Sequence, residues 1–583
     1  MNERKELLVN TKQKLLTQRH QILSMPPEKA LDFILDAPVP AALVHSFPEE
    51  DLYFLINDIG LADSFPLIEL ASDRQWEYML DVEIWQKDRL DIQAAMQWID
   101  RFLKVDPARV AGRFSEERLD LMELILFNTI EVRIREKNQD PSDFGDDFFT
   151  EDDIFYVRIN YGLFADENEQ RSESTSQSIR TTVKTFLDRL SREDHMRYQN
   201  ILLESASVIP AEVEEENFRL RNIRLAEKGY LPFDEAIGIY QPLKVTDLAQ
   251  MQRKTSSSAK FADVMLEAMT LVPIYAFNIL PKDNIFSRAL QKIIDPILLE
   301  ELKFEFTSLC NQLIAADQKE IKQRDTLDEV VLKAASYLSL GLEKIKASNH
   351  KLDSNNDVAS LSKYFLINIF QVAFHEALEL KWRAKKWYNS SWFVKAGLPL
   401  SFWDEAFVGV LGGLLIKKPL FFSNLKGSLL YRDFSSLEDI EITSAVLDEI
   451  IAFDDLLALA QINPASLKTT EFPTYKNLLL TGWAVSYSGL NISENNLLTL
   501  DFDKFKYFFE DLWQNNGKSS KIKDSMKSNF LSWLSDLTGL DDFAITNRMG
   551  KGLEKLFKEV ENELGQVALE FLDPKFIKLF IIE

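Results

Sequence analysis

The chain has 583 residues, and its 67 lysines and arginines stand against 92 aspartates and glutamates, giving a net charge of −25. A protein that binds nucleic acid neutralises phosphates with lysine and arginine, so this charge argues against a nucleic-acid partner. Only 19 glycines, five histidines and one cysteine are present, and these residue types hold most phosphates, soft metals and reactive thiolates. We therefore expect no cofactor and no metal site.

The bulk composition predicts a folded protein with a large core. Hydrophobic residues make up 46% of the chain, including 41 phenylalanines and 10 tryptophans. The first residues carry no apolar signal-peptide segment, and the longest apolar runs, Phe407–Ile416 and Leu271–Leu280, are about half the length of a membrane span. Because the single cysteine, Cys310, can form no intramolecular disulfide, we predict a cytoplasmic location.

Short helices are predicted from Pro26 to Phe114, with starts near residues 27, 48, 72, 91 and 107. Ser46-Phe-Pro-Glu49 has the pattern of a capping box, and Asp106-Pro107 that of an N-cap followed by a first-turn proline. The irregular spacing of about twenty residues indicates a degenerate helical repeat. Residues 48–60 resemble the helical repeats of bacterial magnesium transporters and flagellar motor switch proteins, which implies a superhelical array of helices.

The next stretch departs from this pattern. A helix is predicted over Glu116–Glu136, then an acidic loop over 140–153, and strand composition at Ile154–Ile159. The loop matches a calcium-binding loop at several positions, but Phe144 stands where an oxygen ligand belongs. A solvated linker followed by a small hairpin or edge strand is the better interpretation.

These elements predict a mainly α fold: an N-terminal array of short helices, repeat-like, followed by larger helical lobes with minor β structure. We predict an N-terminal domain over residues 1–137 and a middle domain over 138–255. A C-terminal domain over 256–583 follows, with a further division near 348–358 as an alternative.

Three blocks in the middle region and one at the end resemble an uncharacterised bacterial protein family. The blocks are 214–221, 224–230, 233–240 and 572–580. This resemblance implies membership over most of the chain and brings no known activity. Read physically, Arg221 and Arg224 share one helix face, and Gly229 is expected to end that helix.

Polar residues in two regions form a candidate cluster, although no catalytic residue is assigned. His375 and Glu379 are four residues apart on one face of a helix predicted over 362–387, but two ligands do not make a metal site. The polar side chains on this helix face have two simpler interpretations, a solvated helix face or a buried hydrogen-bonded network. The candidate cluster comprises Arg221, Arg224, Glu235, Tyr240, His375 and Glu379.

One segment is basic in this acidic chain. Nine lysines and arginines and only two acidic residues lie between Lys381 and Arg432, together with four of the ten tryptophans. This composition is typical of protein interfaces and of helices on anionic membranes. Ordinary core packing with lysine stems along it, and a pocket for an anionic ligand, are alternatives. The candidate partner-binding residues are Trp382, Arg383, Lys386, Trp387, Trp392, Lys417 and Lys418.

The leading hypothesis from the sequence is a non-catalytic cytoplasmic scaffold or regulatory protein that binds another protein. An enzyme using carboxylates and arginines in an inter-lobe cleft is the first alternative, so enzyme activity stays open. Peripheral attachment to a membrane surface is the second. The sequence identifies no small-molecule ligand.

Overall fold

The computed structural model describes residues 14–583 apart from several segments, and divides into two compact units. The segments outside the description are residues 16, 117, 161–168, 206–208, 254–272, 274, 321, 323, 349–355, 424–428, 461–472, 490–498 and 515–520, with the side chains of 113–116, 169–176, 324 and 356. Unit 1 comprises residues 1–241, 245–338 and 348–371, and unit 2 comprises 242–244, 339–347 and 372–583. Unit 1 spans both predicted boundaries, at 137 and 255, so the three-domain division stays a prediction.

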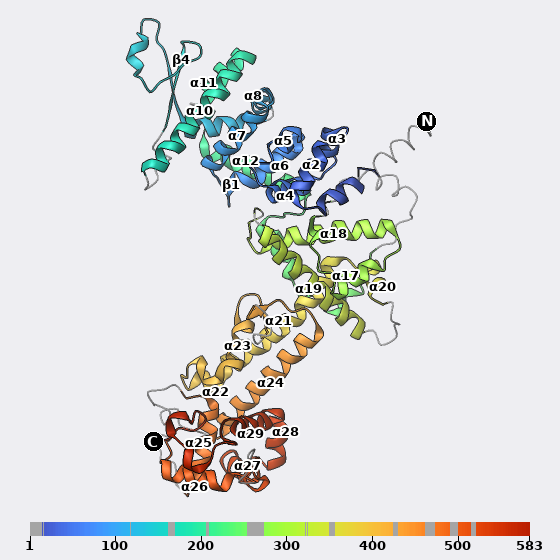
Figure 1. The fold of residues 1–583 in the computed structure, drawn as a ribbon, viewed down its shortest axis with the longest axis vertical. Helices are drawn as coiled ribbons and strands as arrows, with labels where there is room; N and C mark the ends of the chain where they lie inside the picture. The colour runs from blue at the N-terminus through green and yellow to red at the C-terminus, as the bar shows by residue number, and fades with distance from the viewer. Residues whose placement is uncertain are drawn as a thin grey trace. The chain divides into compact units, whose positions relative to one another are not determined.

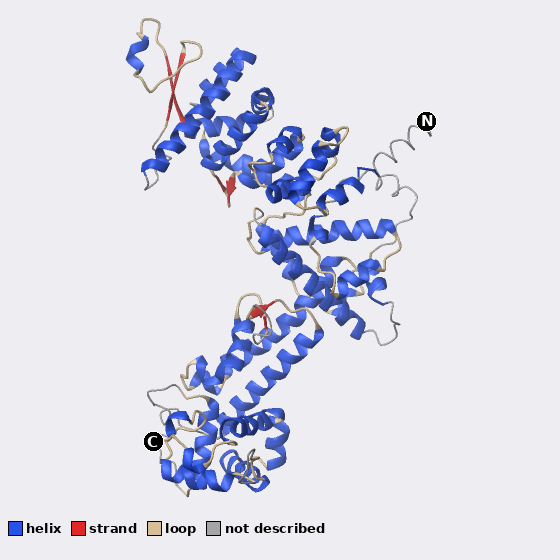
Figure 2. Cartoon of the chain, viewed as in Figure 1, coloured by secondary structure: helices blue, strands red, loops and turns tan. Residues whose placement is uncertain are grey.

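The mainly α fold class is confirmed, since helices dominate both units (Figures 1 and 2). The helices that lie in unit 1, the last of them continuing into residues of unit 2, are α2 (Pro27–Leu35), α3 (Pro40–His45), α4 (Glu49–Ile59), α5 (Phe65–Leu70), α6 (Asp73–Glu83), α7 (Ile92–Val105), α8 (Pro107–Glu116), α9 (Leu119–Thr129), η1 (Pro141–Phe144), α10 (Glu169–Glu193), α11 (His195–Ser205), α12 (Pro210–Glu227), α13 (Phe233–Ala236), η3 (Ile237–Tyr240), α14 (Val245–Leu248), α16 (Tyr275–Asn278), α17 (Ile285–Gln291), α18 (Pro296–Ala316), α20 (Asn356–Lys363) and α19 (Arg324–Ser348).

Unit 2 holds a second set of helices, of which α21 begins in residues of unit 1. They are α21 (Leu366–Ser390), α22 (Trp392–Lys395), η5 (Leu400–Trp403), α23 (Asp404–Leu415), α24 (Leu437–Leu459), α25 (Tyr475–Tyr487), α26 (Phe502–Leu512), α27 (Asp524–Thr538), α28 (Asp542–Met549), α29 (Lys551–Leu564), η7 (Leu569–Phe571) and η8 (Pro574–Phe576).

The strands form three small antiparallel hairpins in the described part of the chain (red in Figure 2). They are β1 (Trp85–Gln86) with β2 (Arg89–Leu90), β3 (Ile130–Ile134) with β4 (Phe155–Ile159), and β5 (Phe421–Phe422) with β6 (Tyr431–Arg432). The predicted strand at 154–159 is confirmed as β4.

The predicted helix starts near 27, 48, 72, 91 and 107 are confirmed to within one residue. Ser72 makes a capping box with Gln75, and the Asp91 carboxylate accepts from Ala94 N. The Asp106 carboxylate accepts from Arg109 N at 3.0 Å. Side-chain caps therefore set the starts of α6, α7 and α8, whereas α2 and α4 begin after a proline without a side-chain cap.

Two local predictions are wrong. Ser46 does not cap α4; it follows α3, and its hydroxyl donates to the carbonyl of Leu43 at 2.6 Å. The helix predicted over Glu116–Glu136 ends at Thr129, and β3 follows at once. The β-branched residues of β3 pair with β4 in the register Val132↔Val157, and this pairing overrides the helical pattern.

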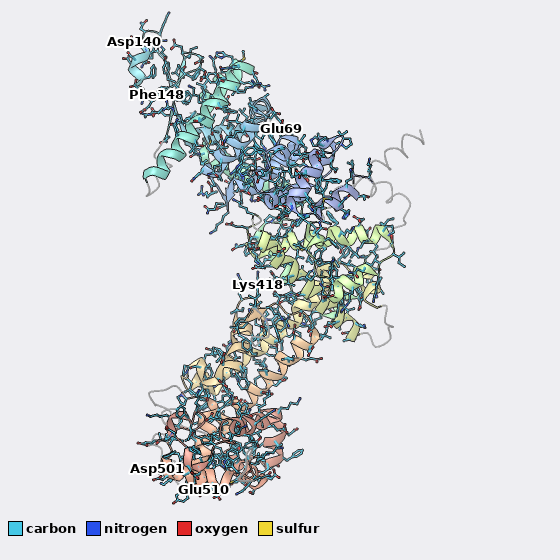
Figure 3. All side chains as sticks on the ribbon, in the orientation of Figure 1. Glu69, Asp140, Phe148, Lys418, Asp501 and Glu510 are labelled. Carbon is cyan, nitrogen blue, oxygen red and sulfur yellow. The ribbon has the colours of Figure 1, made fainter. Side chains whose placement is uncertain are left out.

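The acidic loop joins β3 to β4. Phe144 is buried and stacks on Tyr156, with ring centroids 3.9 Å apart. Phe148, labelled in Figure 3, has the guanidinium groups of Arg133 and Arg158 over its ring at 4.9 and 5.0 Å. Aromatic contacts thus anchor the loop to the hairpin.

The helices in the middle of unit 1 pack in successive pairs. α4 packs against α6 and α16, α16 packs against α18, and α18 packs against α13 and η3. Trp76 of α6 is fully buried and stacks on Phe102 of α7, with centroids 4.2 Å apart.

Aromatic side chains fill the interior of unit 2. Trp403 is fully buried, and its ring lies 5.9 Å from Trp387 and 5.6 Å from Tyr475. Trp483 of α25 contacts Phe508 and Phe530 edge to face. Burial of rings this large contributes much of the free energy of a core.

Among the described helices, none alone has the length and hydropathy needed to cross a membrane. One pair, Leu366–Lys395 with Leu400–Leu415, passes that test together by length and composition and is bent by 100°.

Gly229 ends α12 as predicted, in a backbone conformation that L side chains rarely adopt. Its φ is +89°, and a Cβ there would lie 2.9 Å from Ser308 Oγ and 3.1 Å from Ser308 Cα. Gly229 therefore permits both the turn and the close approach of α18.

Gly229→Ala should lower the free energy of unfolding by about 1–3 kcal/mol, because it adds backbone strain and a steric contact. Urea denaturation followed by circular dichroism measures this change. Gly112→Ala in α8 is the matched control, since a Cβ at Gly112 meets nothing within 4 Å. Equal effects of the two substitutions would contradict this account.

Candidate functional site: a polar pocket in unit 1

A cavity of about 420 Å³ lies wholly within unit 1, between α4, α6, α12 and α18. Charged side chains gather on its walls beside apolar ones. The lining residues used below are Glu49 and Glu50 of α4, Glu77, Tyr78 and Asp81 of α6, Arg224, Leu225 and Lys228 at the end of α12, Pro273, and Phe304, Thr307 and Ser308 of α18.

Helix periodicity places these groups. Glu77 and Asp81 are four residues apart on α6, and Arg221, Arg224 and Lys228 follow one another at spacings of three and four, so each set shares one helix face. Glu49 and Glu50 lie in the first turn of α4, where the helix dipole favours carboxylates.

Asp81 forms the first wall of the pocket. It is 4% exposed, and Arg224 donates to both of its carboxylate oxygens at 2.7 Å. Arg118 lies 3.7 Å from Asp81 and also binds Glu77, and Arg221 donates to the Asp81 carbonyl at 2.6 Å. The guanidinium groups of this wall therefore bind acceptors within the protein itself.

Lys228 forms the second wall with two carboxylates. Its Nζ lies 2.7 Å from Glu49 and 3.6 Å from Glu50, and 5.6 Å from the centre of the Tyr78 ring. The ammonium thus hydrogen-bonds to Glu49 and forms a longer ion pair with Glu50. One positive charge serves two carboxylates here.

A buried polar network supports this end of the pocket. Tyr275 N donates to Asp51 at 3.0 Å, and the Tyr275 hydroxyl donates to Asn311 Oδ1 at 2.6 Å. Asn311 Nδ2 in turn donates to the carbonyl of Lys228 at 2.6 Å. The network holds the end of α12 against α4, α16 and α18.

The surroundings of Glu50 change its acidity. Burial raises the pKa of Glu50 from 4.5 to about 7, Lys228 partly offsets this, and the neighbouring Glu49 adds to it. Burial also raises the pKa of the Tyr78 hydroxyl. In the first wall, burial lowers the pKa of Arg221 to about 10. Carboxyl groups that titrate near neutral pH in a cleft are candidates for binding or proton transfer.

The candidate polar cluster is distributed over several places. Arg221 and Arg224 meet at Asp81, as described above. The Tyr240 hydroxyl donates to the Asp317 carboxylate at 2.5 Å, and Lys333 Nζ binds the same carboxylate at 2.9 Å. Glu235 is exposed on α13. His375 and Glu379 belong to unit 2, where Nε2 of His375 lies 3.4 Å from the Glu379 carboxylate.

The candidate partner-binding residues differ in exposure. Trp382 is 46% exposed, Trp387 is 6% exposed and Trp392 is half-buried. Trp387 Nε1 donates to the buried Asp454 at 3.1 Å. Lys386 and Lys417 are exposed, and Lys418, labelled in Figure 3, is half-buried.

Arg383, the remaining candidate of this set, is exposed on α21 and binds Asp448 and Ser444 of α24. The exposed part of the segment therefore centres on Trp382 and the nearby basic side chains.

The sequence pointed to Arg224 but missed Glu49, Glu50, Tyr78, Asp81 and Lys228. Lys228 had a signal, since it lies four residues after Arg224 on the same face. Glu50 had none, because an acidic first turn is common in helices. In the described part of the chain, no group of three or more histidine, cysteine, aspartate or glutamate side chains is arranged to hold a metal ion.

The model of a family described as "Family of unknown function (DUF6178)" matches residues 9–583, so the chain belongs to this family. No curated protein and no solved structure matches the chain.

Glu50 should make stability fall as pH rises. The unfolded Glu50 carboxyl loses its proton near pH 4.5 and the folded one near pH 7. Between these values the folded protein binds more protons than the unfolded chain, so the free energy of unfolding falls as the pH rises. Glu50→Gln removes this dependence. We expect the free energy of unfolding of the variant to rise relative to that of wild type by on the order of 3 kcal/mol between pH 4.5 and pH 8.

Urea denaturation of both proteins at pH 5, 6, 7 and 8 measures this difference. Glu227→Gln is the control, because Glu227 lines the same pocket but is exposed. A constant difference between Glu50→Gln and wild type across this range would contradict the burial of an undercompensated carboxyl.

Proposed function

We propose that the protein is a regulatory binding protein whose pocket in unit 1 takes a small organic ligand. The supporting observation is the Glu50 carboxyl, which is 2% exposed, lines the cavity and shares one ammonium with Glu49. A buried carboxyl destabilises a fold unless its charge is compensated. A pocket wall that lowers the stability of the fold is typical of a binding site rather than of simple packing.

The size and lining of the cavity support the same proposal. Pockets for small molecules measure roughly 300–1,000 Å³ and combine apolar walls with a few convergent polar groups. Here Leu225, Pro273 and Phe304 supply apolar surface beside Glu50 and Lys228. A second cavity of about 370 Å³ has Asp100 and Lys104 on its wall, but these form an exposed ion pair within one helix.

The enzyme alternative would use this pocket rather than an inter-lobe cleft. A glutamate whose pKa lies near 7 suits general acid–base catalysis. Binding and catalysis differ in the fate of the ligand, which is recovered unchanged in one case and converted in the other.

A thermal-shift screen of the full-length protein against a library of small organic metabolites tests the proposal. We expect at least one ligand to raise the Tm by several degrees, because a ligand that binds only the folded state stabilises it. Ser308→Phe should abolish the shift by filling the cavity, and Ser308→Ala, which leaves it open, should retain it. Melting of the ligand-free variants checks that both fold.

The proposed function is overturned if no compound of the library raises the Tm in a way that Ser308→Phe abolishes. Mass spectrometry of the recovered ligand separates binding from catalysis. An unchanged ligand supports the regulatory protein, and a converted one supports the enzyme alternative.

A second proposal is a scaffold that binds an acidic protein partner through α21. It is supported by the 46% exposure of Trp382 near the exposed Lys385 and Lys386. An exposed tryptophan with flanking cations is the composition of interface hot spots, and the local positive charge would steer an acidic partner.

Co-purification from the native cell lysate tests the scaffold. Wild-type protein should retain a stoichiometric acidic partner, and Trp382→Ala combined with Lys386→Ala should lose it. Trp387 is unsuitable for this test because it is buried and hydrogen-bonded to Asp454. Lys558→Ala, an exposed lysine of α29, is the control, and equal recovery with both variants would contradict the mapping.

A cytoplasmic location belongs to the same proposal. It is supported by the single cysteine, Cys310, which is buried and can form no intramolecular disulfide.

A further inference from the structure

The charges around the pocket are unevenly balanced. At the first wall, Asp81 and Glu77 face two guanidinium groups, since Arg224 and Arg118 both bind them. At the second wall, Glu49 and Glu50 face the one ammonium of Lys228. The first wall is satisfied, whereas the second has one carboxylate more than it has cations.

Glu50 is the more buried of these two carboxylates, since its side chain is 3% exposed and that of Glu49 is 19% exposed. Lys228 hydrogen-bonds to Glu49 at 2.7 Å and forms a longer ion pair with Glu50 at 3.6 Å, so the two carboxylates compete for one ammonium. Glu50 also has Glu49 and Asp51 as neighbours on its own helix, and the hydroxyl groups of Tyr78, Tyr230 and Tyr275 face it from other elements. A cation that enters the cavity would therefore gain attraction at Glu50, and an anion would be repelled there.

The protein already shows how an ammonium fits this environment. The Lys228 Nζ lies between carboxylates and 5.6 Å from the centre of the Tyr78 ring. A tyrosine face attracts a cation through its quadrupole, and the apolar side chains of Leu225, Pro273 and Phe304 line the remaining space. Alkyl carbon next to an ammonium group matches this combination.

Resting on the proposed function, we propose that the pocket recognises a small ligand by an alkylammonium group placed against Glu50. The alkyl part lies along the apolar wall formed with α18. Free diamines and amino acids with an ammonium side chain both carry this chemistry. Arg74, an exposed cation at the cavity, would favour the amino acid because it can bind a carboxylate.

Isothermal titration calorimetry of the full-length protein with 1,4-diaminobutane and with L-ornithine tests the inference. Both probes keep their ammonium groups at pH 6 and pH 8, whereas the Glu50 carboxyl ionises between these values. We expect binding to strengthen by roughly tenfold from pH 6 to pH 8. Glu50→Gln should weaken binding at pH 8 by at least about tenfold and remove the pH dependence.

Glu235→Gln is the matched control, since Glu235 is exposed on α13 and does not line the cavity. It should bind as wild type does. Tighter binding of L-ornithine, lost in Arg74→Gln, would identify the amino acid as the source, and equal binding of both probes would identify the diamine. The unfolding curve of Glu50→Gln confirms that the variant is folded.

Two outcomes overturn the inference. The first is the absence of binding by either probe at millimolar concentration and pH 8, and the second is binding that Glu50→Gln leaves unchanged. If inorganic phosphate or a neutral metabolite then binds and Ser308→Phe abolishes that binding, the ammonium assignment fails while the proposed function stands. If no molecule binds in a way that Ser308→Phe abolishes, both fail.

Discussion

The ion pair between Asp81 and Arg224 is the interaction on which the candidate site depends. It joins α6 to α12 across a sequence separation of 143 residues, through two hydrogen bonds of 2.7 Å. A guanidinium that binds both oxygens of a carboxylate fixes orientation as well as distance. Because Asp81 is buried, the pair leaves one favourable arrangement of the two helices. The position of Lys228, one turn further along, follows from it.

Two buried carboxylates of unit 1 illustrate how counter-charge decides the character of a site. Asp81 has guanidinium partners on two sides, from Arg224 and Arg118, and becomes part of a closed network. Glu50 is equally buried but shares one lysine with Glu49, so its proton is held up to about pH 7. The first arrangement serves structure, since all its charges have partners within the protein. The second leaves two carboxylates with one lysine, so Glu50 keeps its proton to a higher pH than an ordinary glutamate does.

The basic segment of unit 2 shows why composition is a weak guide to a surface. Tryptophan suits both cores and interfaces because it combines a large apolar area with one hydrogen-bond donor. Trp387 and Trp403 are used in the core, and the Asp454 carboxylate accepts from Trp387 Nε1 and from the backbone N–H of Trp392 and Phe393. Trp382 of the same helix contacts the His375 ring edge to face and stays 46% exposed. The exposure of each tryptophan therefore depends on which side chains pack against its face of the helix.

The amino-acid sequence by itself determined the mainly α class, the starts of the N-terminal helices and the turn at Gly229. These features depend on neighbours within a few residues: proline in a first turn, aspartate or serine at an N-cap, and glycine at positive φ. Only the tertiary structure decided that residues 130–134 form a strand, because their partner lies in residues 155–159. The pocket was decided in the same way, since its walls come from α4, α6, α12 and α18. The charge and burial of Glu50 depend on groups that the chain brings together only when these helices pack.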